Sequence, residues 1–387
     1  MSTNRHESNI DLFFKLVRAG LWGDVKVNGY RLKVKESDID WGEIMRLAEE
    51  QAVVGLVAAG IDRFKLQVPG FKIPQEWALQ FIGQTLQIEQ QNKAMNEFVA
   101  KLIELLRKND IYAILVKGQG IAQCYERPLW RASGDVDLLL SDYNYRIACD
   151  MLGKIADSAE RETAKNAERK HQEYQIDSWT VELHGTMHTS LSKRIDKGVD
   201  NVQGDVFCGG NVRSWQNGNT QVFLPRADED VIFVFTHILQ HLFLEGIGLR
   251  QVCDWCRLLY TFRNSLDYGL LESRIKRMGL MSEWRVFAAL AVQHLGMPEE
   301  AMPMFGSSVQ AFKGKAKRLM DFIMEVGNFG HNREVEWSND LKRRTSLIWH
   351  RITDTFRLTF VFPYDAPKFL MNYALNGVKG ILAKSKM

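Results

Sequence analysis

The sequence contains no long uninterrupted hydrophobic run. Its most apolar stretch, residues 231–244, is interrupted by Thr236, His237, Gln240 and His241. A helix that crosses a bilayer needs roughly 20 consecutive apolar residues. The sequence therefore predicts no transmembrane segment.

Cysteine is scarce, and the start of the chain lacks the pattern of a secretion signal. The five cysteines are irregularly spaced, and their odd number leaves at least one unpaired. Secreted domains that depend on disulfides carry dense sets of cysteines, and exported chains begin with a basic stretch followed by an apolar one. We therefore expect a reduced, cytoplasmic protein.

Neither sign of charge dominates the composition. The 50 Lys and Arg residues stand against 47 Asp and Glu residues, which leaves a formal net charge of +3. A protein that binds nucleic acid over a broad surface is usually far more basic. The composition does not indicate such a surface, and any basic region must be local.

The spacing of apolar residues changes near residue 111, from a helical pattern to a strand pattern. Before it, apolar residues recur at helical spacing over 8–21, 41–64 and 76–108. The continuous apolar run 111–116 then predicts a buried strand, and residues 179–183 alternate as a second strand does. We expect three regions: helical 1–95, a core at 96–225 and helical 226–387.

Two aspartates separated by one residue begin another strand of the core. Side chains alternate between the faces of a strand, so Asp135 and Asp137 point the same way while Val136 and Leu138 point into the core. Carboxylates this close repel one another unless a cation lies between them, and hard divalent cations prefer oxygen ligands. A polar turn leading into a strand is the simpler alternative, but the glycine turn ahead of it favours a metal site.

Glycine and basic residues flank this strand. Gly118 and Gly120 follow the first predicted strand, where they let the backbone approach a ligand, and a helix beginning there would direct its N–H groups at phosphate. Lys117 adds a positive charge. Arg131, just ahead of Gly134, has two interpretations of similar weight: bidentate contact with a triphosphate, or a structural salt bridge.

These residues, taken in order, resemble the pattern of a known family. Lys117-Gly118, Arg131, residues 134–138 and residues 181–184 are similar to the uncharacterised bacterial nucleotidyltransferases of the DNA-polymerase-β-like superfamily. The resemblance implies an α+β fold, in which a nucleotidyltransferase-like core with a mixed β-sheet is flanked by N- and C-terminal helical regions. It also implies a third carboxylate on a neighbouring strand, for which Glu182 is the best candidate.

The resemblance further implies transfer of a nucleoside monophosphate from a nucleoside triphosphate to an acceptor. The metal ligands would be Asp135, Asp137 and Glu182, holding two Mg²⁺ or Mn²⁺ ions. The nucleotide would contact Lys117, Gly118, Gly120, Arg131, Gly134 and Arg250. The acceptor stays open between a small molecule, an RNA and a protein. Two alternatives remain: a toxin-like nucleotidyltransferase acting on RNA or protein, and a catalytically silent nucleotide-binding or scaffold module.

Histidines and cysteines outside the core allow a different interpretation. One set of residues has the composition of a zinc site: His237, His241, Cys253 and Cys256. The cysteines lie in a continuous helical pattern, however, so packing is the favoured interpretation. Arg250 and Asp254, four residues apart, either form a helix-surface ion pair or order a helix over the nucleotide. His171 stays outside the predicted catalytic set, because a lone histidine is more often a packing residue.

Overall fold

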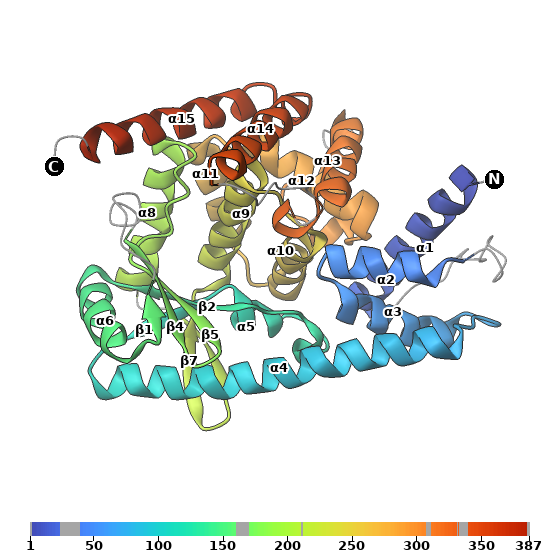
Figure 1. Ribbon diagram of the computed structural model, residues 1–387, viewed down its shortest axis with the longest axis horizontal. Helices are drawn as coiled ribbons and strands as arrows, with labels where there is room; N and C mark the ends of the chain where they lie inside the picture. The colour runs from blue at the N-terminus through green and yellow to red at the C-terminus, as the bar shows by residue number, and fades with distance from the viewer. Residues whose placement is uncertain are drawn as a thin grey trace.

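The protein is described here from a computed structural model, which covers residues 2–23, 39–159, 170–209, 212–306, 311–330, 332 and 340–384. Helices surround a β-sheet, and one long helix runs along a whole edge of the molecule (Figure 1). Within the described residues, every helix is too short or too polar to cross a membrane.

Four helices form the N-terminal region: α1 (Ser2–Trp22), α2 (Trp41–Glu50), α3 (Val54–Gln67) and α4 (Gln75–Lys108). The helical pattern over 41–64 divides between α2 and α3 because Ala52 between them has a φ of 54°, which ends a right-handed helix. Helix α4 lies beneath both the small N-terminal helices and the sheet (Figure 1). It continues without a break through residue 95, so it ties the first region to the core.

Helices α1 and α3 cross at closely spaced glycines. A Cβ atom on Gly20 would stand 2.1 Å from the carbonyl oxygen of Leu56, and one on Gly60 would stand 2.0 Å from that of Leu16. Real Cβ atoms do not come this near to backbone atoms. The two helices therefore pack backbone against backbone, and only glycine fits at these positions.

The sheet has five strands in the order β1-β2-β5-β4-β3. Their bounds are β1 (Ala113–Val116), β2 (Asp135–Leu140), β3 (Ser158–Ala159), β4 (His171–Ile176) and β5 (Trp179–His184). Strands β2 and β5 are parallel, and the other neighbours are antiparallel. The sheet is thus mixed, and the predicted α+β fold is confirmed.

Short elements complete the core around this sheet. Helices α5 (Gly118–Ala122) and α6 (Asp142–Ile155) each follow a strand, and Pro128–Trp130 forms a 3₁₀ turn. Strands β6 (Arg213–Asn217) and β7 (Thr220–Leu224) make a separate hairpin, in which β7 packs against α4 and β1. Helix α6 and the β3–β4 pair supply the crossover that a parallel β2–β5 pair requires.

The C-terminal region is helical, as predicted. Its described helices are α9 (Ala227–Leu244), α10 (Leu249–Phe262), α11 (Tyr268–Met278), α12 (Met281–Leu295), α13 (Lys313–Val326), α14 (Asp340–Thr359) and α15 (Asp365–Lys384), with 3₁₀ turns at Glu299–Ala301 and Asn328–Gly330. A further helix, α8 (Lys193–Cys208), lies inside the segment predicted as the core. Helix α9 is buried along most of its length. Its Phe235 packs against the rings of Trp255, Trp284 and Phe287, which joins α9, α10 and α12 into one core.

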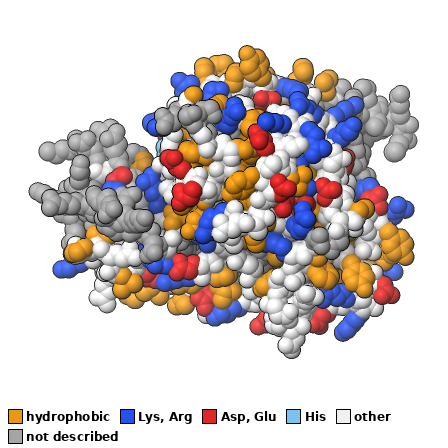
Figure 2. Space-filling model, turned by 180° about the vertical axis from the view of Figure 1, so that it is seen from behind, with side chains coloured by type: hydrophobic (Ala, Val, Ile, Leu, Met, Phe, Trp, Pro, Cys, Tyr) orange, Lys and Arg blue, Asp and Glu red, His pale blue; other side chains and the backbone are white. Residues whose placement is uncertain are grey.

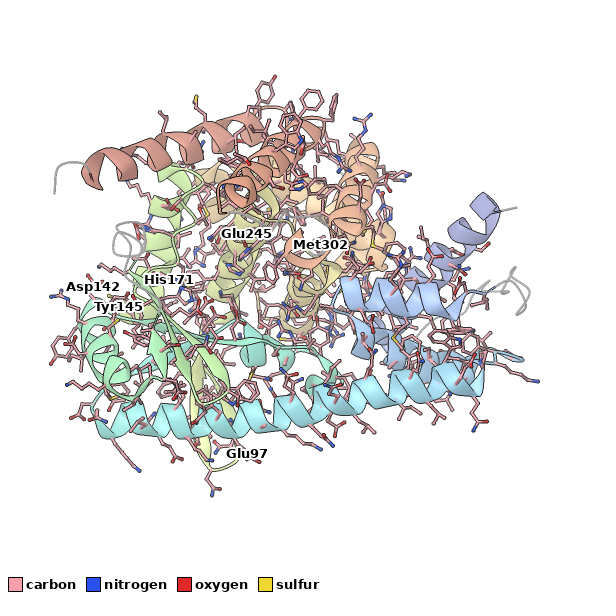
Figure 3. All side chains as sticks on the ribbon, in the orientation of Figure 1. Glu97, Asp142, Tyr145, His171, Glu245 and Met302 are labelled. Atoms are coloured by element: carbon pink, nitrogen blue, oxygen red, sulfur yellow. The ribbon has the colours of Figure 1, made fainter. Side chains whose placement is uncertain are left out.

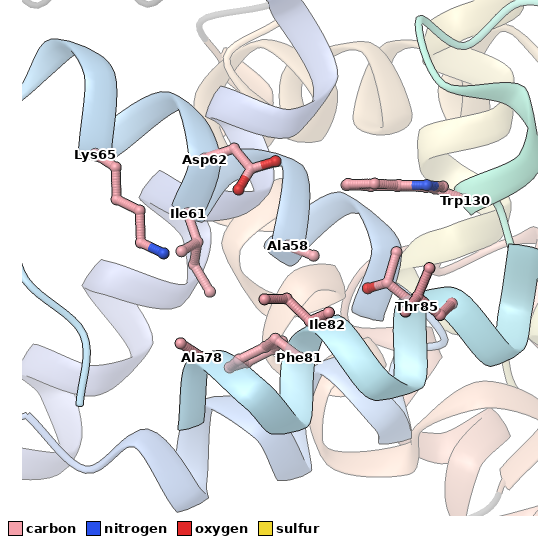
Figure 4. A pocket seen from close by; sticks show the side chains of 10 residues that line it. Ala58, Ile61, Asp62, Lys65, Ala78, Phe81, Ile82, Thr85 and Trp130 are labelled. Carbon is pink, nitrogen blue, oxygen red and sulfur yellow. The ribbon is translucent and has the colours of Figure 1, made fainter. Parts of the chain in front are cut away.

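The surface combines mixed charge with a shallow apolar pocket. Figure 2 shows basic and acidic side chains interspersed over the face it presents. The pocket lies between α3 and α4, where Ile61, Phe81 and Trp130 are among its lining residues (Figure 4). None of the residues predicted to bind metal or nucleotide lines it. The pocket is therefore separate from the chemistry that the sequence predicts.

Candidate functional site

The three predicted carboxylates meet where β2 and β5 pair. In the register of this parallel pair, Asp137 stands beside Glu182 and Asp135 beside Thr180. The side chains of Asp135, Asp137 and Glu182 offer oxygen atoms that all lie within 4.8 Å of one another. Val136 on the opposite face is 1% exposed. The period of two along β2 thus places the acids on one face, as the sequence predicts.

The acids repel one another strongly enough to affect their ionisation. The pKa of Asp135 is raised, first by the charge of Asp137 and then by burial. Asp137 itself is 1% exposed, and its Oδ1 lies 2.5 Å from the Nζ atom of Lys117. Burial opposes the charged form of Lys117, but the carboxylates outweigh burial and raise the pKa of the ammonium. The cluster therefore favours positive charge at its centre.

Lys117 reaches this position through an unusual backbone. It follows β1 with a φ of 58° and a ψ of −145° and immediately precedes α5. Non-glycine residues rarely adopt positive φ, and such conformations concentrate at functional sites because the surrounding structure must enforce them. The turn at the end of β1 thus directs the ammonium group at the carboxylates.

Two histidines complete the ring of partners around the acids. The Nε2 atom of His184 lies 2.8 Å from Asp137 Oδ1 and 3.4 Å from Glu182 Oε2. His171 Nε2 lies 3.3 Å from the same Glu182 oxygen. Burial disfavours the charged form of Glu182, but the contacts with His171 and His184 and the charge of Lys117 hold its pKa well below the usual range. Glu182 is therefore ionised in the folded protein.

Helix α9 brings a further histidine to the same place. His237 Nε2 lies 3.5 Å from Lys117 Nζ and 3.0 Å from His241 Nε2. Burial, followed by the charges of Lys117 and His241, lowers the pKa of His237 well below its ordinary value. The sequence indicates a possible zinc set for these two histidines, but it does not place them beside Lys117. Their approach to Lys117 joins residues far apart in the chain, which no local motif indicates.

The structure argues against a zinc site formed by His237, His241, Cys253 and Cys256. Cys253 and Cys256 are both fully buried inside α10. Among the described residues, the groups of potential metal ligands contain neither cysteine and neither His237 nor His241. Burial raises the pKa of both thiols, which disfavours the thiolate form that a zinc ligand needs. The cysteines pack in the core, because residues three apart on a helix share the face that meets the core.

The three glycines predicted to contact the nucleotide have different surroundings. Gly118 has a φ of 36° and begins α5, so the predicted turn is present although the helix is only five residues long. A Cβ atom on Gly120 would stand 2.8 Å from Leu224, so the close approach at Gly120 is to this side chain. A Cβ atom on Gly134 would meet open space. Gly134 alone thus borders room that a ligand could use.

Arg131 forms a structural salt bridge, the second of the two interpretations of this residue. Its Nε and Nη2 atoms donate to Asp254 at 3.0 and 2.6 Å, and both side chains are almost fully buried. Burial opposes the charge of Arg131, but Asp254 outweighs it and raises the pKa. Asp254 also accepts a hydrogen bond from Tyr125. A helix-surface pair with Arg250 was one of two interpretations of Asp254, and among the described ion pairs Asp254 instead pairs with Arg131 across the fold.

Arg250 instead faces the strand that carries the metal motif. Its Nη1 atom donates to the carbonyl oxygen of Ala132 at 2.7 Å, while its buried Nε atom has no acceptor among the described residues. Burial, and then the charge of Arg131, lowers the pKa of Arg250, while Asp135 acts in the opposite direction. A donor without an acceptor thus stands near Asp135.

This donor set suits a hard divalent cation. Three carboxylates present oxygen ligands, and the excess negative charge has drawn in the ammonium of Lys117. Such clusters bind Mg²⁺ or Mn²⁺ in enzymes that transfer phosphoryl or nucleotidyl groups. The arrangement can hold an ion and place positive charge beside it.

Comparison with known proteins identifies the family of the chain. Residues 37–296, from α2 to the end of α12, match a family described as uncharacterised nucleotidyltransferases. No curated protein and no solved structure matches the chain. The match spans well over half of the sequence and includes every residue of the carboxylate cluster. The chain belongs to this family of uncharacterised nucleotidyltransferases.

Proposed function

We propose that the protein transfers a nucleoside monophosphate from a nucleoside triphosphate to an acceptor, with Mg²⁺ or Mn²⁺ held by Asp135, Asp137 and Glu182. The observation that carries the proposal is the convergence of these three carboxylates on one face of the β2–β5 pair. A divalent ion bound there supplies charge neutralisation for the triphosphate.

The neighbouring residues suit the binding of phosphate. The ammonium of Lys117 already lies within the carboxylate cluster, and the buried Nε of Arg250 has a hydrogen to donate. Oxygen atoms of a triphosphate accept from such donors. Gly134 borders open space, which leaves room for the nucleotide next to β2. Arg131 acts indirectly in this proposal, since its pair with Asp254 fixes the segment that leads into β2.

Asp135→Asn is the sharpest test. Asp135 has the raised pKa of a carboxylate in a repulsive cluster, so neutralising it relieves repulsion and preserves the fold. Replacing Asp137 would instead deprive buried Lys117 and His184 of their partner. Asp142→Asn serves as the matched control, because this exposed acid on α6 contacts only Lys170 among the described ion pairs.

The experiment measures binding of each nucleoside triphosphate with Mg²⁺ by calorimetry, and release of pyrophosphate with candidate acceptors. We expect Mg²⁺-dependent binding in the wild-type protein and in the Asp142→Asn variant, and its loss in Asp135→Asn. Unfolding curves check that all three proteins are folded. Full transfer activity in Asp135→Asn would refute the mechanism, and absence of binding to every triphosphate would favour a catalytically silent module.

A further inference from the structure

A second group of potential metal ligands lies beside the aspartates and contains nitrogen. It consists of His171 at the start of β4, with Glu182 and His184 on β5, and its ligand atoms all lie within 4.8 Å of one another. Figure 3 shows His171 at the same end of the sheet as Asp142 and Tyr145. Only Glu182 is common to this group and to the carboxylate cluster.

The antiparallel pairing of β4 and β5 holds the two histidines in place. His171 stands directly opposite His184 in the register, and their ring centroids are 4.9 Å apart. The pairing continues one residue further, where Gly185 N donates to the carbonyl oxygen of Lys170 at 2.7 Å. Sites built on strands are more rigid than sites on loops. The two imidazoles are therefore fixed before any ligand arrives.

Two of the distances within the group match the separation of ligands around a metal ion. The Nε2 atoms of His171 and His184 lie 3.3 and 3.4 Å from the same Oε2 atom of Glu182. Hydrogen bonds between charged nitrogen and oxygen are usually about 2.7–2.9 Å long. Two ligands of a tetrahedral Zn²⁺ ion, each bound at about 2.0–2.1 Å, stand about 3.3–3.4 Å apart. Both separations match an edge of that tetrahedron.

We propose that His171, Glu182 and His184 bind a divalent transition-metal ion, with Zn²⁺ as its best representative. Two imidazoles and one carboxylate favour such ions over Mg²⁺, which prefers oxygen ligands alone. The side chains of His171 and Glu182 are 25% and 22% exposed, so an ion can enter and a water molecule can complete its coordination. Three protein ligands plus one water is the usual arrangement of an accessible zinc site.

Binding at this site rearranges the contacts of one histidine. His184 Nε2 now lies 2.8 Å from Asp137 Oδ1, and it must give up its proton and this hydrogen bond to ligate the metal. Asp137 retains its ion pair with Lys117. Since Glu182 belongs to both groups, an ion held by the histidines also withdraws a ligand from the aspartates. The binding itself does not depend on the proposed transfer reaction.

The test uses the full chain freed of metal and titrated with Zn²⁺ alone, with Co²⁺ as the spectroscopic substitute. The informative variant is His171→Gln, because His171 is partly exposed and pairs with neither aspartate among the described residues. His188→Gln is the matched control, since its imidazole is similarly exposed, at 26%, and its Nε2 also lies near a carboxylate, 2.6 Å from Asp200. Asp135→Asn separates this site from the carboxylate cluster.

We expect the wild-type protein to bind one Zn²⁺ per chain and to give Co²⁺ the intense visible absorption of a tetrahedral site. His171→Gln should weaken binding by about 100-fold or more, which exceeds the usual loss from removing a mere partner of a ligand. His188→Gln and Asp135→Asn should both bind as the wild type does.

Two results would overturn the proposal. One is equal Zn²⁺ affinity in the wild type and His171→Gln, which would place the ion elsewhere. The other is loss of Zn²⁺ binding in Asp135→Asn, which would assign the ion to the carboxylates. Failure of the zinc proposal is distinguishable from failure of the proposed function, because Mg²⁺-dependent nucleotide binding is measured separately and is the activity that Asp135→Asn is expected to lose.

Discussion

Replacing Asp254 by asparagine should destabilise the protein severely, because it leaves a buried guanidinium without its counter-ion. Asp254 accepts from Arg131 through both carboxylate oxygens, at 3.0 and 2.6 Å. The two side chains are only 7% and 6% exposed. The asparagine keeps one acceptor oxygen, but its amide group would turn two hydrogens toward Arg131 or Tyr125. The charge of Arg131 would then lie in a region that water does not reach.

The burial of the pair sets the expected magnitude. Breaking a buried ion pair by removing one partner costs about 3–5 kcal/mol, whereas an exposed pair contributes about 0–1 kcal/mol. Whole domains are stable by about 5–15 kcal/mol, so Asp254→Asn should remove a large part of the free energy of unfolding. The double variant Arg131→Met with Asp254→Leu should recover much of the loss, because it removes the unpaired charge as well.

Urea unfolding followed by tryptophan fluorescence measures these changes. Asp62→Asn provides the comparison: Asp62 pairs with Arg127 at a similar distance of 2.7 Å, but their side chains are 45% and 42% exposed. We expect Asp62→Asn to alter the free energy of unfolding by less than about 1 kcal/mol. Equal effects of the two substitutions would show that Arg131 is not held by Asp254, and would return Arg131 to the candidates for nucleotide contact.

Two further predictions concern a buried acid and a close helix contact away from the site. Burial, with the neighbouring carboxyl of Asp365, raises the pKa of Glu283 from 4.5 to about 9. Between these pH values the native state keeps the proton on Glu283, while the unfolded chain has lost it. The free energy of unfolding should therefore fall as pH rises from about 4.5 to about 9. Glu283→Gln should flatten this decline in urea unfolding; an unchanged pH dependence would contradict the assignment. Gly60→Ala should lower the free energy of unfolding by several kcal/mol, because its Cβ would stand 2.0 Å from a carbonyl oxygen. A Cβ on Gly83 would meet nothing within 4 Å, so Gly83→Ala should raise the free energy of unfolding by about 0.5–1 kcal/mol through α4. Similar thermal midpoints for these two variants would refute the close packing of α1 on α3.

The parts of the site that follow from local periodicity could be predicted from the sequence. Alternation along β2 places Asp135 and Asp137 on one face, and the same rule places Glu182 with His184 on β5. The family resemblance supplied the pairing of these strands, and the register then aligns Glu182 with Asp137. The mixed sheet and its helical flanks followed from the same two sources.

The partners that come from distant segments could not be predicted in this way. The spacing of four residues on a helix made a pair with Arg250 one of two interpretations of Asp254, yet Asp254 binds Arg131, which lies 123 residues away in the chain. Spacing within a helix indicates which side chains share a face, but it does not indicate which element covers that face. The approach of His237 to Lys117 was missed for the same reason.

The charges of the carboxylate cluster indicate what it can bind. Asp135, Asp137 and Glu182 carry three negative charges when ionised, and the ammonium of Lys117 neutralises only one of them. The remaining excess is visible in the raised pKa of Asp135, whose largest cause is the charge of Asp137. A divalent cation would offset this excess and would lower that pKa by attraction. The repulsion among these acids is therefore a cost to the folded protein that metal binding can offset, which is the behaviour expected of a binding site and not of a structural ion pair.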